Sequence, residues 1–583
     1  MLLCLVVVVL WKVFYIAPLE KERAVWAAAQ HTQELEKKKQ FEKDRASGKL
    51  SLDQVLAEGA SLPPEQMPAR GEVVDHGFSE HRRIKIESPR LHGSLALEGA
   101  LLDDLTLADY KVTLAKDSPD VVLLAPKGTK EAYFIETGWL PAGEGVRAPD
   151  KTTLWKTDHD KLTPENPVTL TWDNGAGLHF KRHIALDKNY LFTITDTVEN
   201  AGKVPAALHP YGLINRTRVD AKAYYVSQEG PLGAFNGVLT EAGYGTLKKE
   251  SKDNPDAKME HDSDNGWMGI ADQYWLTALI PAQDAAFHST IYYYNKSGQD
   301  RYQVDFRSQH GLEIPAGGSA SFTQHVFAGA KMVKIIDTYR TELNLPLFDR
   351  TINYGSLYFL TRPMFFVLDF FNGLLGNFGL AILLMTVLVK LCVFPLANKS
   401  FRSMARLKTH MPELQALRER FKHDKPKMNQ EMMKFYKENR INPMAGCMPL
   451  LVQIPVFFSL YKVLFITIEM RHAPFFGWIK DLSASDPLNI INLFGVLPWG
   501  VPHWFPAIGP FSVLFVLTMY LQQWISPQPT DQTQRTIARV MPLFLVVMFS
   551  NSSFPVGLVI YWCWSNSLSI LQQWVITRKL NKR

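Results

Sequence analysis

The sequence predicts a polytopic α-helical membrane protein with six spans, of which five form a helical core, and a large antiparallel β-sandwich domain outside the cytoplasm. Three observations predict this fold class. Apolar segments of membrane-spanning length gather in the C-terminal third, the polar middle alternates with period two between turn residues, and basic residues gather directly after spans. The averages of 46% apolar and 12% aromatic residues over 583 residues conceal this partition.

Residues 1–17 form the first apolar run, LLCLVVVVLWKVFYIA from Leu2 to Ala17. The run has no basic n-region, and no small-x-small cleavage site follows directly, so we expect an uncleaved transmembrane anchor rather than a signal peptide. It is short for a span and contains Lys12. Either the start site lies upstream of Met1, or the lysine snorkels to the interface. Residues 18–70 are first charged and then proline-rich, which indicates a tether and linker.

Residues 71–345 contain runs such as VVLLAP, PVTLTWDN and STIYYYN between Gly, Pro, Asp and Asn turns. This pattern predicts the β-sandwich, and helical spacing from Lys331 to Leu343 is expected to close the domain. The segment between residues 18 and 360 has no cysteine, which excludes a disulfide framework.

The β-domain offers no pattern typical of a metal or catalytic site. His179, His183 and His209 lie on strand or turn sequence without metal-ligand spacing, so surface polarity is the expected role. There is no phosphate loop, nucleophile elbow or HExxH helix. We therefore expect no metal, no cofactor, no enzymatic activity and no use of nucleotide hydrolysis.

Residues 362–376 predict an amphipathic helix at the membrane interface, which leads into a span at residues 377–397. That span contains one formal charge, Lys390. A lysine in hydrocarbon costs roughly 2.5 to 3.5 kcal/mol on insertion scales, so its side chain should face protein, water or a partner charge. Snorkelling to the inner headgroups is the alternative.

Residues 399–440 follow this span and hold 12 Lys and Arg against 5 Asp and Glu. Their apolar spacing predicts two helices in an antiparallel basic hairpin. The other spans are expected at 444–468, 508–526, 535–550 and 554–576, with an interfacial or re-entrant loop at 469–507 and a basic tail at 577–583. The basic excess orients the hairpin and the C-terminus toward the cytoplasm. Alternation of the spans then places the N-terminus in the cytoplasm and the β-domain outside it.

Polar residues share one depth on several predicted spans. On this topology Lys390 lies in the cytoplasmic leaflet with Thr386 one turn away, and the cytoplasmic half of the last span is polar. The candidate set is Lys390, Thr386, Gln453, Ser459, Tyr561, Trp562, Ser565, Asn566 and Ser569. These residues predict a wet recess open to the cytoplasm. The alternative is that the hydroxyls and amides only hold neighbouring helices together.

Several short sequence motifs resemble those of one protein family. They are GNFG at 376–379, a charged residue five before Pro395, EMMKFYKENRINPMAGCMPLLVQIPVF at 431–457, EMRHAPF at 469–475 and FPVGLVIYWCWSNSLSILQQW at 554–574. With the anchor and the β-domain, nearly the whole chain resembles the YidC-type membrane protein insertases of Gram-negative bacteria, relatives of the Oxa and Alb insertases. Two features depart from the family: Lys390 stands where arginine is common, and the first helix lacks a polar lead.

The resemblance implies an inner-membrane insertase and chaperone that works without nucleotide, alone or with the Sec translocon. Its groove would open to cytoplasm and lipid, with Lys390 holding acidic residues of an incoming segment. The periplasmic β-domain would be a mutarotase-like sandwich without known catalysis. The hairpin would receive nascent inner-membrane proteins, the ribosome or the receptor of the signal recognition particle, with no direct nucleic-acid function, through Arg402, Arg406, Lys408, Arg418, Arg420 and Lys422.

Two other classes of protein remain as alternatives. A membrane-anchored periplasmic carbohydrate-binding or mutarotase-like protein would show activity in its isolated β-domain and tolerate changes in the helices. A secondary transporter would show inverted repeats, and the two halves of this sequence share no internal repeat.

Overall fold

The computed structural model describes residues 67–581 except 143–145, 219–228, 255–256, 297, 440–447, 501–504, 506–507, 527–531 and 550–553. The predicted anchor at 1–17 and nearly all of the tether at 18–70 lie outside the described residues. The chain divides into two compact units, with Thr351 in the first, Ile352 in the second, and Lys331–Val333 assigned to the second.

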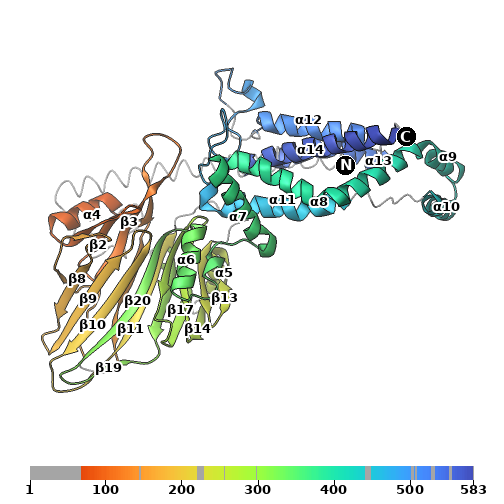
Figure 1. Ribbon diagram of the computed structural model, residues 1–583. Coiled ribbons are helices and arrows are strands. Elements are labelled where there is room, and N and C mark those ends of the chain that lie inside the picture. The colour runs from red at the N-terminus through yellow and green to blue at the C-terminus, as the bar shows by residue number, and fades with distance from the viewer. Residues whose placement is uncertain are drawn as a thin grey trace. The chain divides into compact units, whose positions relative to one another are not determined.

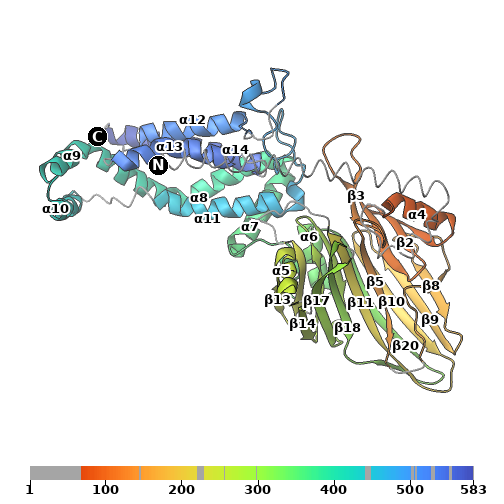
Figure 2. The same cartoon turned by 180° about the vertical axis from the view of Figure 1, so that it is seen from behind.

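The first unit consists of two β-sheets (Figures 1 and 2). The eleven-stranded sheet has the order β14-β17-β18-β11-β5-β3-β2-β1-β7, with β19 beside β11 and β4 beside β3. Its strands are β1 Arg83–Glu87, β2 Leu91–Ala96, β3 Leu101–Lys111, β4 Asp120–Leu124, β5 Tyr133–Pro141, β7 Lys161–Leu162, β11 Ala206–Arg218, β14 Lys258–Ser263, β17 Phe287–Lys296, β18 Gln299–Ser308 and β19 Leu312–Ile314.

The nine-stranded sheet has the order β13-β12-β15-β16-β20-β10-β9-β8-β6. Its strands are β6 Lys156–Thr157, β8 Val168–Asp173, β9 Leu178–Leu186, β10 Leu191–Asn200, β12 Gly230–Phe235, β13 Val238–Glu241, β15 Gly266–Ala271, β16 Trp275–Ile280 and β20 Ser319–Ala330. The paired strands run antiparallel except for β1 and β7. The antiparallel β-rich domain predicted from period-two sequence is thereby confirmed.

Three helices and a 3-10 turn accompany the sheets: α4 Arg70–Ser79, α5 Tyr244–Asp253, α6 Val333–Glu342 and η3 Phe348–Thr351. The helix expected from Lys331 to Leu343 corresponds to α6. Helices α4 and α5 were not foreseen. Helix α4 holds two glycines and buries only Val73, so its sequence carries almost no helical apolar stripe.

Strand β10 shows how alternation builds the core. Its residues alternate between buried and half-buried positions along LFTITDTVEN, which places Phe192, Ile194 and Val198 on the face toward the other sheet. Asp196 occupies one position in this buried row and is 2% exposed. An ionised carboxylate there requires a partner, because burial without one costs several kcal/mol.

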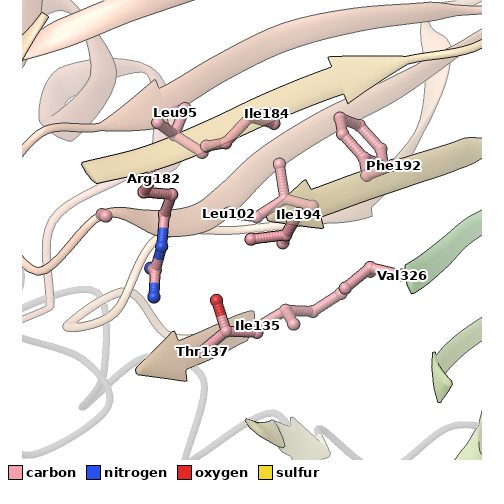
Figure 3. A pocket seen from close by; sticks show the side chains of 10 residues that line it. Leu95, Leu102, Ile135, Thr137, Arg182, Ile184, Phe192, Ile194 and Val326 are labelled. Carbon is pink, nitrogen blue, oxygen red and sulfur yellow. The ribbon is translucent and has the colours of Figure 1, made fainter. Parts of the chain in front are cut away.

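Arg182 on β9 is that partner. Its Nε and Nη2 donate to the two carboxylate oxygens of Asp196 at 2.6 and 2.9 Å, and the guanidinium also lies 5.4 Å from the ring centroid of Trp155. Arg182 lines a small cavity of about 10 Å³ whose other walls include Leu95, Ile135 and Val326. Figure 3 shows these side chains. The pair therefore lies in an apolar layer between the sheets.

We expect Asp196→Ala to destabilise this domain by about 3 to 5 kcal/mol, because the variant leaves a buried guanidinium unpaired. Hydrogen exchange of β9 and β10 peptides in the detergent-solubilised full chain should accelerate by about 100-fold or more. Glu199→Ala on the same strand is the control, since it removes the exposed ion pair with Lys181, for which about 1 kcal/mol or less is expected. Equal acceleration in both variants would contradict the importance of the buried pair.

The second unit is helical and contains α7 Tyr358–Leu375, α8 Phe378–Thr409, α9 Met411–Arg420, α10 Lys425–Glu438, α11 Met448–Ile466, α12 Pro510–Ile525, α13 Gln532–Phe549 and α14 Val556–Asn581, with 3-10 turns η5 Ile468–Met470 and η6 Ile490–Asn492. Helix α14 packs against α8, α11 and α12, α13 packs against α12, and α7 packs against α8 and α11 (Figure 1). The predicted helical C-terminal part is confirmed.

Helix α8 continues through the boundary that composition indicated. The sequence placed the end of a span at residue 397 and the start of the hairpin at 399, whereas α8 runs unbroken from Phe378 to Thr409 with Pro395 inside it. The change to basic residues at Lys399 alters the polarity of the helix and does not end it. The hairpin is therefore formed by the end of α8 together with α9 and α10.

By length and composition, one helical segment of the described residues, Phe378–Ser403, is long and apolar enough to cross a membrane. Shorter apolar segments are Val452–Ile466, Pro510–Ile525 and Thr536–Val546. The number of spans, six, stays a prediction.

Helix α7 is the segment predicted to lie at the interface. It buries Thr361, Met364, Phe365 and Leu368 on one face, and it ends at Gly376, whose φ of 65° is left-handed. The opposite face exposes Phe359, Phe366, Phe370 and Leu374. Among the described residues none buries these four side chains, and an apolar face of this kind is suited to contact with lipid.

Candidate functional site

Lys390 lies far from both ends of α8. It is 12 residues after Phe378 and 19 before Thr409, which corresponds to ~18 and ~28 Å along the helix. Its Nζ donates a hydrogen bond to Ser569 Oγ on α14 at 2.8 Å, and that hydroxyl donates to the carbonyl of Ser565 at 2.9 Å. The lysine therefore reaches across to a neighbouring helix and does not snorkel along its own helix.

A cavity of about 30 Å³ adjoins Lys390 between α8, α11 and α14. Lys390, Gln453, Ser569 and Gln572 supply its polar wall. The apolar wall consists of Val389, Val393, Leu396, Ala397, Phe401, Val452 and Val456. The volume suffices for about two water molecules. Within the described part of the chain, the buried Nε2 of Gln572 has no hydrogen-bond partner, so this wall retains an unused donor.

Gln453 links this cavity to a second polar contact. Its Nε2 donates to the hydroxyl of Tyr561 on α14, so α11 is bonded to α14 as well as packed against it. Trp562 points elsewhere, and its ring centroid lies 4.7 Å from that of Phe457 and 5.1 Å from that of Phe515. Trp562 thus belongs to an aromatic cluster formed by α11, α12 and α14.

Other predicted groove residues take part in helix packing. Thr386 is 1% exposed and donates to the carbonyl of Ile382 in its own helix at 2.6 Å. Asn566 donates to Thr518 on α12 at 3.3 Å. Ser459 is buried, and its Oγ has no hydrogen-bond partner among the described residues. The nine candidates therefore separate, with Lys390, Gln453 and Ser569 lining the cavity and the other six outside its lining.

Sequence reasoning missed some contacts of the site. Gln572 was not assigned to the groove, although it lies three residues after Ser569 and thus on the same helix face. The indole of Trp564 donates to the carbonyl of Leu383 at 3.2 Å and joins α14 to α8. The polar residue Thr518 within an apolar segment was the only signal of the Asn566 contact. Apolar lining residues such as Val452 carried no signal that separates them from lipid-facing residues.

The basic candidates lie on α8, on α9 and, for Lys422, in the turn that follows α9. Arg402, Arg406, Arg420 and Lys422 are exposed, and Arg418 is half-buried. Lys408 lies within α8, but its side chain is outside what the structure describes. Helix α9 packs against α10, and the His410 and Phe435 rings lie 6.0 Å apart, so these elements form a hairpin with a basic exterior.

The three β-domain histidines do not meet at one site. His179 contacts Asp173 at 2.7 Å, His183 lies 3.4 Å from the Thr169 hydroxyl, and His209 Nδ1 lies 3.0 Å from the Ser308 carbonyl oxygen. Each has a separate polar neighbour. Across the residues that the structure covers, no group of three or more His, Cys, Asp or Glu side chains is placed to hold a metal ion.

Two family models match consecutive parts of the chain. The YidC periplasmic domain matches residues 83–367, and the 60Kd inner membrane protein matches residues 370–583. The chain belongs to the YidC family. The YidC resemblance read from the sequence is thereby confirmed, and membership supports a location in the inner membrane.

Relatives match over most of their length. The membrane protein insertase YidC of Rickettsia bellii is 44% identical over 575 residues, which cover 98% of this chain and 96% of that protein. The membrane protein insertase YidC of Granulibacter bethesdensis is 46% identical over 507 residues, or 86% of this chain and 87% of that protein. These names describe insertases and not enzymes.

Solved structures were also found. An active YidC insertase with its first transmembrane domain resolved is 16% identical, covers 84% of this chain and 92% of that chain, and has a TM-score of 0.34. A galactose mutarotase related enzyme from Lactobacillus acidophilus is 9% identical, covers 42% of this chain and 97% of that chain, and has a TM-score of 0.31.

The contact between Gln453 and Tyr561 can be measured by a double-mutant cycle. We expect Gln453→Ala and Tyr561→Phe to be coupled by about 0.6 to 1.5 kcal/mol, because each variant removes the same hydrogen bond between α11 and α14. The measurement is reversible unfolding of the full chain in mixed detergent. Gln453→Ala combined with Asn566→Ala is the control pair, since Asn566 bonds to α12. The changes in the free energy of unfolding caused by these two substitutions should add. Additive effects in the first pair would contradict the contact.

Proposed function

We propose that this chain inserts proteins into the inner membrane and helps them fold, using Lys390 as a docking point for acidic residues of an incoming segment. One observation carries the proposal: in a member of the YidC family, the Lys390 amine lines a small polar cavity between three helices, and its hydrogen-bond partner among the described residues is a neutral hydroxyl. A carboxylate can replace that hydroxyl with a gain in attraction.

The energetics favour this exchange. A charge pair 4 Å apart gains about 4 kcal/mol at an effective permittivity of 20 and about 1 kcal/mol in bulk water. The bond to Ser569 compensates only partly for burial of the lysine, since a hydrogen bond to a charged group contributes roughly 1.5 to 3 kcal/mol. Partition of the apolar substrate segment into lipid then supplies the net drive, without nucleotide.

The cavity must widen for this to occur. A space for about two water molecules cannot hold a helix, so α8, α11 and α14 have to part on one side. Two hydrogen bonds cross interfaces that would open. Gln453 is bonded to Tyr561 across the interface of α11 and α14, and Lys390 is bonded to Ser569 across the interface of α8 and α14. We infer that these two bonds hold the resting state closed.

The topology completes the proposal. Six spans with both termini in the cytoplasm put the β-domain in the periplasm and the hairpin of α9 and α10 in the cytoplasm, as the positive-inside rule requires. The partners are nascent inner-membrane proteins and the bilayer, with the Sec translocon, the ribosome and the receptor of the signal recognition particle as further contacts. The exposed arginines on α8 and α9 support an anionic partner at the hairpin.

Lys390→Ala should reduce insertion of substrates with acidic translocated tails by about tenfold, whereas Lys390→Arg should retain it, because the charge is what the substrate uses. Insertion would be assayed in cells depleted of the native insertase, with tails that differ only in Asp or Asn. Tails with Asn should be less affected.

Lys399→Ala is the matched control, since it removes the same charge from an exposed position of the same helix. Its insertion rate should equal that of the native chain. If Lys390→Ala inserts the acidic tail as well as the native chain does, the docking role of Lys390 is refuted.

The hairpin assignment leads to a separate prediction. Replacing Arg418, Arg420 and Lys422 together by Gln should weaken binding to ribosomes that carry a nascent membrane protein by about tenfold at low salt, and less at high salt, because exposed charges are screened. Binding of the purified full chain would be measured by cosedimentation.

Replacing Lys425, Lys427 and Lys434 by Gln makes the same change of charge on α10. This control should bind as the native chain does. Equal loss in both variants would mean that overall charge, and not the α9 surface, is responsible.

A further inference from the structure

The eleven-stranded sheet carries a hollow of about 610 Å³ on the face that points away from the nine-stranded sheet. Leu95, Leu102 and Ile135 point into the space between the sheets, as Figure 3 shows. Ala96, Leu101 and Phe134, each next to one of these residues, line the hollow and therefore point to the opposite face. Helix α4 and the segments at 126–128 and 151–152 form its rim.

The floor of the hollow is apolar. Ala96, Leu101, Ala132 and Phe134 form a buried cluster, and the partly buried Leu213 packs against it. This cluster is separate from the core between the sheets. A hollow with an apolar floor can hold the body of a ligand of small-molecule size, for which volumes of ~300 to 1,000 Å³ are typical.

The walls are basic. They contain Arg82, Arg83, Lys127, Lys151 and Arg301 against two acidic residues, Glu98 and Asp103. Arg83 is bonded to Asp103, and Arg82 lies 3.8 Å from Glu98. Among the described residues, no ion pair joins Lys127, Lys151 or Arg301 to a carboxylate. The hollow thus holds an excess of three positive charges.

Arg301 is the most constrained of these cations. It is 7% exposed, and its Nη2 donates to Gln299 at 3.0 Å. Its buried Nε has no hydrogen-bond partner in the part of the chain that the structure covers. A buried guanidinium donor on the wall of a hollow is a binding group for an anionic oxygen.

Lys127 shows that the cations affect one another. Its Nζ lies 5.7 Å from the Phe134 ring centroid. The side chain as a whole is exposed, but the surrounding wall removes water from the ammonium and lowers the pKa of Lys127. Attraction by Glu136 opposes this shift, and repulsion by Lys151, Arg301 and Lys296 adds to it. An anion among these groups would relieve the repulsion.

We propose that this hollow binds a small anionic ligand, a carboxylate or phosphate group carried on a body with an apolar face. The anionic group would contact Arg301 and Lys127, and the body would cover Phe134 and Leu101. The site is independent of the groove at Lys390 and of the insertion function.

The test uses calorimetric titration of the detergent-solubilised full chain with three probes: phenyl phosphate, inorganic phosphate and benzyl alcohol. Phenyl phosphate should bind most tightly, because it supplies both the anion and the apolar body, and benzyl alcohol should not bind. Lys127→Gln and Arg301→Gln should each weaken phenyl phosphate binding by about tenfold or more, as expected for loss of a charged hydrogen bond.

Lys130→Gln is the matched control, because it removes a nearby exposed lysine that does not line the hollow, and its affinity should equal that of the native chain. Competition then distinguishes the source of the anion. Displacement of phenyl phosphate by dihexanoylphosphatidylglycerol indicates a lipid headgroup, and displacement by glycerol 3-phosphate alone indicates a soluble ligand.

Two results would overturn the proposal. One is phenyl phosphate binding no tighter than benzyl alcohol. The other is native affinity in Lys127→Gln, whose exposed side chain can be replaced without disturbing the fold even if Arg301→Gln cannot.

Discussion

The hydrogen bond from Lys390 to Ser569 supplies the acceptor that a buried ammonium group needs, and much of the helical unit depends on this constraint. A lysine far from both ends of a long apolar helix has to find an acceptor, because hydrocarbon offers none. Here the acceptor is a serine on α14, and α14 is also the helix that contacts α8, α11 and α12. The bond of this one charge therefore joins α8 to α14, which also pack against each other.

The two units solve the problem of a buried cation differently. In the β-domain, Arg182 is bonded through two nitrogens to the carboxylate of Asp196, and this pair is fully compensated. In the helical unit, Lys390 is bonded to a neutral hydroxyl. A compensated pair stabilises a fold, whereas a cation with a neutral partner retains affinity for an anion. The first arrangement suits structure and the second suits exchange of ligands.

The sequence was most informative where one physical signal dominates. Period-two alternation predicted the β-domain, and apolar length with basic flanks predicted the helical part. Composition could not show that α8 continues to Thr409. The change from apolar to basic residues at Lys399 indicates where the polar part of the chain begins, and it does not indicate where the helix ends. Spacing placed Lys390 and Ser569 at similar depth, but it could not tell that Thr386 bonds within its own helix, since that depends on how each face packs. The hollow beside Arg301 had no sequence signal, because its residues come from separate strands and loops.

The length of α8 has a mechanical consequence. Lys390 and Arg402 belong to one helix and are separated by 12 residues, or ~18 Å. A force on the hairpin end of α8 is therefore transmitted to the buried amine, except as far as the helix bends at Pro395, where the backbone lacks a donor for the preceding turn. The stiffness of α8 at Pro395 therefore determines how much of a force applied to the hairpin reaches the hydrogen bond between Lys390 and Ser569.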